Sequence, residues 1–397
     1  MTVNFDVVVA GHVCLDLLPD LSGAEHEAFA KAFLPGRLIA AGPVCYATGG
    51  SVANTGLALS QLGIACRLVA KVGDDLFGRA IQQIVATHGA RLAEDFVVDP
   101  LASTAYSLII NYPGVDRIFL HYAGANDTFA TGDVPFDLLK QSRLFHFGYP
   151  PIMRATYLDG GAVLEEIFRR ARATGVTTSL DMAFPDPSSE AGQVDWRRIL
   201  ECVLPQVDLF LPSVEETLFM LRRETHQALC RAAQGSDILA LMTPELLSDL
   251  GQELIGLGAK VVGLKLGYRG LYLRTGDQMA MRAMGRAKPC QPAAWAAQEL
   301  WAPCFKVSVA GTTGSGDATI AGFLGALLRG LSIEQASTMA VAVGACNVEA
   351  TDALSGIRPW EDTVRRVRAG WERQPLELDV PGWQFDQTYG LWRGPCA

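Results

Sequence analysis

The residues Gly311-Thr312-Thr313-Gly314-Ser315-Gly316-Asp317 join an extended run to a long helical segment rich in small residues. Such a junction can bind phosphate, because unpaired backbone N–H groups at a helix N-terminus attract anions and glycine lets the anion approach. A carboxylate at Asp317 would repel phosphate, so it better suits a base that accepts a proton from an attacking hydroxyl. A helix cap explains this stretch alone equally well, since Asp and Thr are common there.

The composition describes a globular protein without general affinity for polyanions. The chain has 397 residues, of which 49% are apolar and 19% charged, so it can bury a large core and is not expected to be disordered. Its formal charge of −9 gives no general attraction to nucleic acid or to an anionic membrane. We therefore expect neither as a partner, and a phosphate substrate would need local positive groups.

The cysteines and histidines do not form a recognisable zinc motif. Nine cysteines are scattered without a Cys-x-x-Cys pair, which predicts buried thiols, and the six histidines do not cluster at close spacing. The first residues lack a basic leader, and no segment has the roughly 20 apolar residues that cross a bilayer. These features favour a cytoplasmic protein.

Short apolar runs alternate with helical patterns along most of the chain. The predicted strands include 5–11, 64–72, 144–147, 177–181, 209–211 and 260–265, and the predicted helices include 51–62, 161–174 and 213–223. This alternation predicts an α/β fold with a parallel sheet covered on both faces and ligands at the carboxyl ends of the strands.

Three segments depart from that alternation. Residues 105–111 and 117–122 predict a β-hairpin that projects as a lid. Residues 284–303, rich in Ala, Pro and Gln, are interpreted as a surface insertion between two strand-like segments. From residue 371 onward we expect a C-terminal extension, 371–397, that packs on the body of the protein.

Further motifs lie where predicted strands end. Thr48 to Asn54 contains Gly49-Gly50, which would let a ligand approach the backbone, and Asn54 offers both a donor and an acceptor to hydroxyls. A plain strand-to-helix turn is an equal alternative. Pro212 to Glu216 predicts a capping box, and the Glu216 carboxylate could also hold Mg²⁺ through water. Lys265 to Gly270 fits either a turn beneath a nucleotide or an ordinary β-turn, and Asp16 could bind sugar hydroxyls or simply solvate a loop.

The order of these motifs resembles that of the PfkB (ribokinase-like) carbohydrate kinases, over roughly Val7 to Val367. The late Thr-x-Gly-x-Gly-Asp motif is fairly specific, and its combination with the early Gly-Gly is stronger. The resemblance implies a three-layer α/β/α kinase domain over residues 1–370, with a mostly parallel central sheet. A small β-sheet lid would come from parts of 12–48 and 104–126. In such enzymes a sugar or nucleoside hydroxyl takes the γ-phosphoryl group of ATP, with Mg²⁺.

The resemblance also implies roles for individual residues. Asp317 matches the catalytic base, and the anion hole matches Gly314, Ser315 and Gly316. The positions that bind the acceptor match Asp16, Gly49, Gly50 and Asn54. Those near the nucleotide match Lys265, Gly267, Gly270 and Thr312, while Glu216 would lie near magnesium.

Four positions depart from the family pattern. Gly311 stands where members commonly have Asp, beside the monovalent-cation loop, which leaves potassium activation doubtful. Ser213 replaces the usual Asn before Glu216, Asp181-Met182-Ala183 retains only the acid of Asp-x-Asn, and Val341 replaces an Asn near the adenine.

Several alternatives stay open at this point. A nucleoside kinase of the same fold, or a sugar- or nucleotide-binding protein without turnover, would share these motifs. The acceptor is not named by the sequence: Tyr106, Asn126 and His121 could face it, although packing is the more usual role of such residues. A lid edge that pairs with a second copy would make a homodimer, and a monomer is the alternative. No Gly-x-Gly-x-x-Gly turn follows the first strand, which argues against a dinucleotide-binding dehydrogenase.

Overall fold

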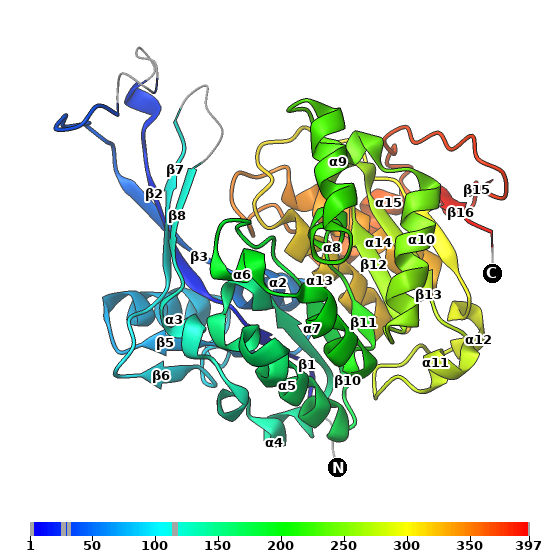
Figure 1. Cartoon of the computed structure of the whole chain (residues 1–397), viewed down its shortest axis with the longest axis horizontal. Coiled ribbons are helices and arrows are strands. Elements are labelled where there is room, and N and C mark those ends of the chain that lie inside the picture. Colours follow the sequence, from blue (N-terminus) through cyan, green and yellow to red (C-terminus); the bar gives the residue numbers. More distant parts are fainter. Residues whose placement is uncertain (1–3, 25–28, 30–32, 113–117, 396–397) are drawn as a thin grey trace.

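The computed structural model describes residues 4–24, 29, 33–112 and 118–395. Its centre is a ten-stranded sheet with the order β15-β16-β14-β13-β12-β11-β10-β9-β1-β4 (Figure 1). In chain order the strands are β1 (Phe5–Gly11), β4 (Cys66–Val69), β9 (Ser142–Gly148), β10 (Thr177–Asp181), β11 (Leu209–Phe210), β12 (Val261–Lys265), β13 (Leu271–Thr275), β14 (Glu299–Ala302), β15 (Gln384–Asp386) and β16 (Leu391–Arg393).

Following the order in the sheet, the neighbours from β4 through β1, β9, β10 and β11 to β12 pair in parallel. The neighbours from β12 through β13, β14 and β16 to β15 pair antiparallel. β1 shows how the sequence specifies the parallel part. Val7 and Val9 pack in the core on one face of the sheet, whereas Val8 and Ala10 pack in the core on the other. A strand buried on both faces needs a continuous apolar run rather than an alternating one. The predicted α/β fold with a mostly parallel sheet is confirmed.

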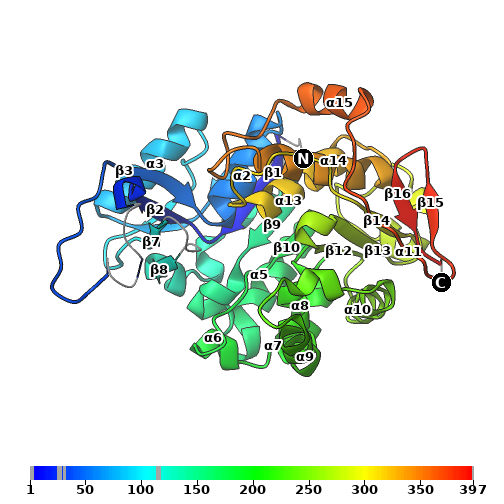
Figure 2. The same ribbon diagram turned by 90° about the horizontal axis from the view of Figure 1, so that it is seen from above.

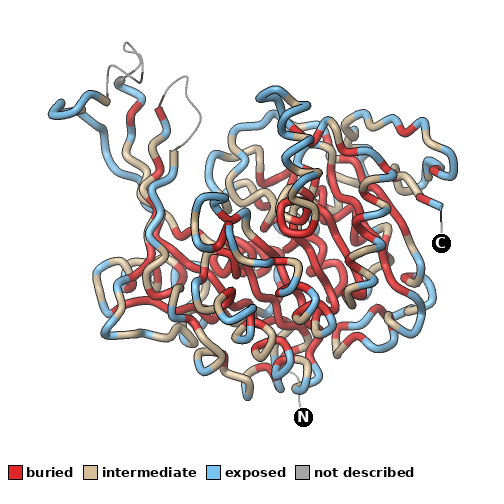
Figure 3. The backbone as a smooth tube through the Cα atoms, in the orientation of Figure 1, coloured by how far each residue is buried: buried red, intermediate tan, exposed pale blue. Residues whose placement is uncertain are grey.

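Helices cover both faces of the sheet, which gives three layers (Figure 2). One face carries α2 (Ser51–Gln61), α13 (Ser315–Leu328), α14 (Ile333–Asn347) and α15 (Trp360–Arg368), and the other carries α5 (Ala162–Ala173), α7 (Trp196–Val203), α8 (Val214–Leu221) and α10 (Pro244–Gly256). Buried backbone is concentrated in the sheet and the helix faces against it (Figure 3). The other α-helices among the described residues are α3 (Leu76–His88), α4 (Phe136–Leu139), α6 (Glu190–Gln193), α9 (Arg223–Ala233), α11 (Gln278–Arg282) and α12 (Pro292–Trp295).

A second, four-stranded sheet projects from the body (Figure 1). Its order is β3-β2-β7-β8, formed by β2 (Cys14–Pro19), β3 (Val44–Gly49), β7 (Tyr106–Ile110) and β8 (Ile118–Tyr122). The predicted small β-sheet is therefore present, and the turn at 113–117 lies outside the described residues. Large apolar side chains are exposed on this sheet, at Val44, Tyr46, Phe119, Leu120 and Tyr122. A homodimer through the lid stays a prediction.

The strand predicted at 64–72 is wrong as a single element. β4 ends at Val69, and Lys71–Gly73 forms β5, which pairs with β6 (Val97–Asp99) in a separate two-stranded sheet. The Val97 N–H donates to the Ala70 carbonyl at 2.8 Å, so the chain changes partner at Ala70.

The interpretation of 284–303 as a surface insertion is wrong for its end, which is a strand inside the main sheet. Glu299–Ala302 is β14, paired with β13 and β16, and Leu300, Trp301 and Ala302 are fully buried. Trp295 is buried as well. A run of only four residues after an Ala- and Gln-rich segment gives little strand signal, so composition misled the prediction.

The expectation of buried thiols holds for Cys14 and Cys346 but is wrong for three others. Cys45, Cys230 and Cys290 are exposed. Cys230 lies on α9, a helix on which no residue is buried. Its exposure is set by the position of that helix, which the residue type does not reveal.

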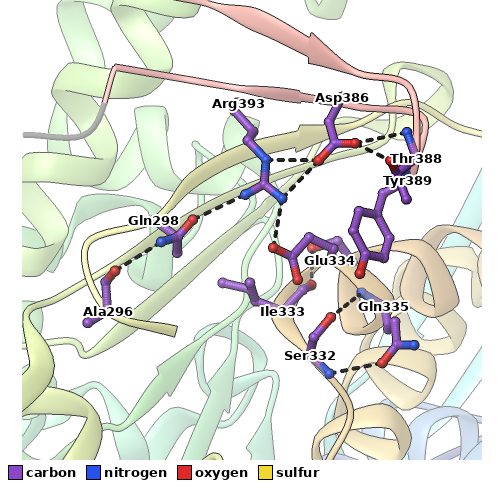
Figure 4. A network of polar contacts seen from close by, with 11 residues as sticks. Ala296, Gln298, Ser332, Ile333, Glu334, Gln335, Asp386, Thr388, Tyr389 and Arg393 are labelled. Atoms are coloured by element: carbon purple, nitrogen blue, oxygen red, sulfur yellow. Dashed lines mark hydrogen bonds and ion pairs between the residues drawn. The ribbon is translucent and has the colours of Figure 1, made fainter. Parts of the chain in front are cut away.

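The C-terminal residues continue the main sheet through β15 and β16, and an ionic network holds them there (Figure 4). Arg393 Nη2 lies 2.8 Å from Glu334 Oε1 of α14 and 2.9 Å from Asp386 Oδ2 of β15. The segment after residue 370 is thus part of the architecture of the body. No helix in the described part of the chain is long and apolar enough to cross a bilayer.

Breaking the buried ion pair between β13 and β14 is expected to destabilise the protein strongly. Arg274 Nη1 lies 3.1 Å from Glu299 Oε2, and Glu299 also accepts a hydrogen bond from Tyr272 at 2.7 Å. Glu299→Ala leaves Arg274 buried without its partner, which costs about 3 kcal/mol in the free energy of unfolding. Urea denaturation measures this loss. The control Glu372→Ala removes an exposed pair with Lys306 and should cost less than about 1 kcal/mol; equal losses would contradict the account.

Candidate active site

The ends of five parallel strands bring polar residues to one edge of the sheet. His12 follows β1, Tyr149 follows β9, Asp181 ends β10, Glu216 follows β11 and Lys265 ends β12. Parallel strands share their carboxyl edge, so residues distant in sequence meet there.

A cavity of about 910 Å³ opens at this edge, and we call it the edge cavity. Every residue that was predicted for catalysis and for the nucleotide lines it. Its lining includes Glu216, Lys265, Gly267, Gly270, Thr312, Gly314, Ser315, Gly316 and Asp317.

The start of α13 decides between a cap and a functional carboxylate at Asp317. The N-cap is Gly314, with φ 72°, and it makes no side-chain capping bond. The carboxylate of Asp317 instead accepts hydrogen bonds from other elements. The interpretation of Asp317 as a helix cap is therefore wrong.

Three donors hold the Asp317 carboxylate. Thr55 Oγ1 donates to Oδ1 at 2.9 Å, and Asn54 Nδ2 donates to Oδ2 at 3.1 Å. Tyr149 OH also donates to Oδ2, at 2.8 Å. Because Oδ2 already accepts two bonds and Oδ1 one, a further donor would find a lone pair on Oδ1.

Tyr149 is a site residue that the sequence analysis missed. Its backbone is left-handed, with φ 69° and ψ 40°, directly before Pro150. A bulky residue in that region is strained, and such strain is concentrated at functional sites. Burial, together with the charges of Asp317 and Asp181, raises the pKa of the Tyr149 phenol far above its ordinary value, so it stays a donor. The only sequence signal was a Tyr-Pro-Pro sequence at a strand end.

Carboxylates outnumber cations in the edge cavity. Lys265 Nζ lies 2.6 Å from Asp181 Oδ1, whereas Asp181 Oδ2 is buried without a hydrogen-bond partner among the described residues. Burial raises the pKa of Asp181; the charge of Lys265 opposes this rise, and that of Glu216 adds to it. Burial also disfavours the charge on Lys265, but Asp181 and Glu216 outweigh it and raise the pKa of Lys265. A bound cation would reduce the repulsion between these carboxylates.

Glu216 has a structural role that accounts for one of its oxygens. Ser213 Oγ accepts from the Glu216 N–H at 3.2 Å, and Glu216 Oε2 accepts from the Ser213 N–H at 2.7 Å. The predicted capping box is confirmed. Oxygen ligands from a few carboxylates suit Mg²⁺, which keeps most of its waters, so Asp181 and Glu216 fit such an ion.

The predicted acceptor residues lie on the other side of Asp317, around the start of α2. Asn54 joins them to Asp317, and Ser51 Oγ and Asn54 Oδ1 are buried without partners in the described structure. Gly49 packs so closely on Asp16 that a Cβ there would lie 2.3 Å from Asp16 Oδ2. Unpaired buried polar atoms beside a carboxylate are what a hydroxyl-rich ligand would satisfy.

The glycines near the nucleotide positions have distinct steric roles. A Cβ at Gly270 would lie 2.0 Å from the Ala302 carbonyl, so this glycine keeps the turn against β14. A Cβ at Gly316 would have Lys265 Nζ as its nearest atom, at 3.5 Å, which places the ammonium over the start of α13. At Gly311 a side chain would lie 2.9 Å from the Thr351 backbone, so the loop leaves no room for the Asp common in the family.

Among the residues with an uncertain role, Asn126 is structural. It donates to the Val13 carbonyl at 2.8 Å and accepts from the Val13 N–H at 3.2 Å, which fixes the link between β1 and β2. Tyr106 packs against the rings of Phe77 and Tyr122. His121 instead lies beside His12, with ring centroids 5.2 Å apart.

Comparison with known proteins identifies the family. The sequence profile of the pfkB family carbohydrate kinases matches residues 5–360. The chain belongs to this family. The predicted family membership is confirmed. The predicted enzyme class, a phosphotransferase that acts on an alcohol group, is also confirmed at the level of the family.

Individual relatives are similar over different shares of their length. Fructokinase-2 of Oryza sativa subsp. japonica is 29% identical over 180 residues, which cover 44% of this chain and only 48% of the relative. Probable fructokinase-6, chloroplastic, of Arabidopsis thaliana is 24% identical over 91% of this chain and 82% of its own length. The crystal structure of fructokinase with bound ATP from Xylella fastidiosa superposes with a TM-score of 0.65 at 20% identity, over 91% of this chain and 98% of that one. The superposition confirms the ribokinase-like fold.

Replacing Gly50 is expected to disturb the acceptor side of this pfkB-family chain through its contact with His12. Gly50 has φ 88°, and a Cβ there would lie 2.6 Å from both the carbonyl oxygen and Nδ1 of His12. Gly235 has φ 87°, but a Cβ there meets no described atom within 4 Å. Both alanine variants should lose roughly 1–2 kcal/mol in the free energy of unfolding, because alanine disfavours the left-handed backbone. Gly50→Ala should lose about 1–3 kcal/mol more, because its Cβ also clashes with His12. Equal losses in urea denaturation would contradict the steric account.

Proposed function

We propose that this protein transfers the γ-phosphoryl group of ATP to a hydroxyl of a sugar, with Asp317 as the catalytic base. The observation that carries the proposal is the position of the Asp317 carboxylate, which lies between the edge cavity and the acceptor side and is held there by Asn54, Thr55 and Tyr149. The pfkB family and the ATP-bound fructokinase support ATP as the donor and a sugar as the acceptor.

The start of α13 is proposed as the anion hole. Gly314 is left-handed and carries no side-chain cap, and Ser315 and Gly316 begin the helix and line the cavity. The Ser315 N–H donates to the Thr312 carbonyl at a long 3.3 Å, a contact that a bound phosphate would replace. The helix dipole adds partial positive charge at the same end. Lys265 lies over Gly316 and would neutralise phosphate oxygens. Thr312, Gly267 and Gly270 line the adjoining wall, where we place the rest of the nucleotide.

Asp181 and Glu216 are proposed to hold Mg²⁺, largely through water. The unpaired Asp181 Oδ2 and the excess of carboxylates in the edge cavity support this placement. When bound, the ion would neutralise charge on the phosphates. Gly311 supplies no carboxylate beside the anion hole, so we propose that turnover does not require potassium; assays with and without it test that point.

The chemical step follows from the free lone pair of Asp317. An acceptor hydroxyl bound by Asp16, Asn54 and the Gly49-Gly50 backbone would donate its proton to Oδ1 of Asp317. Its oxygen then forms the new bond to the γ-phosphorus, while the bond between that phosphorus and the bridging oxygen breaks and ADP leaves. Positioning and charge neutralisation supply most of the rate in such transfers.

The acceptor class is the part of the proposal with a close competitor. A nucleoside offers similar ribose hydroxyls, and a binding protein without turnover would need the same contacts. The fructokinases among the relatives favour a sugar. Measuring ADP release over a panel of sugars and nucleosides separates the two kinase alternatives. Ligand-induced thermal stabilisation without ADP release would favour the binding protein.

Asp317→Asn should lose most turnover and keep most of its nucleotide affinity. The amide is nearly isosteric, but it cannot accept the hydroxyl proton, and positioned bases contribute roughly 10²- to 10⁴-fold in rate. Steady-state ADP release gives kcat, and calorimetry with ATP and Mg²⁺ gives the nucleotide affinity. An unchanged kcat would overturn the assignment of the base.

Tyr149→Phe is expected to lower kcat and to leave the nucleotide affinity unchanged. The variant removes one of the three donors that orient the carboxylate of Asp317. Tyr157→Phe is a matched control, because it removes a phenol hydroxyl that has no contact with Asp317 in the described structure and should keep the wild-type kcat. Equal kcat values for the wild type and Tyr149→Phe would show that Tyr149 does not position the base.

A further inference from the structure

Two histidines and a cysteine meet at the base of the lid. His12 follows β1, Cys14 begins β2, and His121 lies on β8. Their potential ligand atoms all lie within 4.8 Å of one another. We call these three residues the lid-base cluster. They come from the body and from two strands of the lid, so a ligand held by all three would join the lid to the body.

His12 is buried without the partners that a structural histidine normally has. It is 1% exposed, and neither ring nitrogen has a hydrogen-bond partner in the described part of the chain. His146 provides a comparison, because its Nδ1 lies 2.9 Å from Ser179 Oγ. An imidazole with two unpaired nitrogens, buried next to a thiol and a second imidazole, points to a missing ligand.

The surroundings of the lid-base cluster suit a metal ion. Ser107 Oγ lies 3.0 Å from His121 Nδ1 and 3.6 Å from Cys14 Sγ, so it can orient both side chains. Asp16 Oδ1 accepts a hydrogen bond from Cys14 Sγ at 3.3 Å, which places a carboxylate oxygen next to the cluster. His121 is exposed, which gives an ion a route from solvent.

We propose that His12, Cys14 and His121 bind a divalent ion of the Zn²⁺ type, with Asp16 as the fourth ligand. One thiolate, two imidazoles and a carboxylate form a donor set that selects zinc over Mg²⁺ or Ca²⁺. Tetrahedral zinc sites place their donor atoms roughly 3.5 Å apart. The three side chains of the cluster must therefore close in, which rotation of the exposed His121 allows. The Asp16 carboxylate, which contacts Cys14 but lies outside the three-residue cluster, must turn toward the ion. Binding releases the Cys14 thiol proton to solvent and leaves the ion bonded to the thiolate.

The occupied site would regulate the enzyme. Asp16 cannot ligate the ion and bind acceptor hydroxyls at the same time, so Zn²⁺ and the sugar should exclude each other. This consequence rests on the proposed function, whereas metal binding itself does not. The expected effect is a higher KM for the sugar with the nucleotide affinity unchanged.

Co²⁺ is a spectroscopic probe for such a site, because a cobalt–thiolate bond absorbs in the near ultraviolet. Titration of the full-length protein should give a thiolate band that saturates at one Co²⁺ per chain and disappears when Zn²⁺ is added. Cys14→Ser should lose the band, and His121→Ala should weaken Co²⁺ affinity at least tenfold. His121 is exposed, so its variant should fold even if changes at His12 do not.

A second cysteine–histidine pair gives the matched control. Cys230 Sγ lies 3.9 Å from the ring nitrogens of His226 on the exposed α9, and Cys230→Ser should keep the band. A band that persists in Cys14→Ser, or no band in the wild type, overturns the metal site. Zn²⁺ inhibition that is competitive with the sugar and lost in Cys14→Ser supports the regulatory consequence. A Cys14-dependent band without ADP release from any acceptor would leave the metal site standing and overturn the proposed function.

Discussion

The hydrogen bonds of Asp317 join the first turns of two helices that are far apart in sequence. Thr55 and Asp317 are separated by 262 residues, yet Oγ1 and Oδ1 lie 2.9 Å apart. A buried carboxylate needs donors, and α2 presents Asn54 and Thr55 at the point where α13 begins. The proposed acceptor side at the start of α2 and the proposed anion site at the start of α13 therefore have a fixed separation, and Asp317 is the group between them.

Charge balance explains why the same edge needs a cationic ligand. Asp181, Glu216 and Asp317 act on one another through a largely buried region, and Lys265 is paired with Asp181. Phosphate groups would add further negative charge, so their binding requires positive charge that the side chains alone do not supply. The proposed Mg²⁺ would resolve both problems, because it would neutralise the carboxylates and the phosphates together. The excess of acids and the proposed nucleotide thus depend on each other.

The sequence predicts features that short local patterns encode and misses those that arise from packing between distant segments. The run Phe5–Gly11 is apolar on both faces and predicts a parallel strand, and Ser213 with Glu216 predicts a capping box. By contrast, β14 is too short to show a period, and composition made it look like an insertion. Tyr149 could not be linked to Asp317, because their contact spans 168 residues. The lid-base cluster was missed for the same reason: His121 enters through the lid, far from Cys14.

The link between β1 and β2 explains why His12 keeps its unpaired nitrogens. Gly11 has φ 129° and approaches Gly148 so closely that a Cβ would lie 2.3 Å from its carbonyl oxygen. Val13 is fixed on the other side by both hydrogen bonds of Asn126. With its two neighbours fixed, His12 cannot move its backbone to bring a partner closer, which is consistent with a ring that an entering ligand would satisfy. Four residues after His12, on β2, is Asp16, proposed both to bind the acceptor and to ligate a metal. A single short connection would then determine both which ligand is bound and whether the lid is joined to the body.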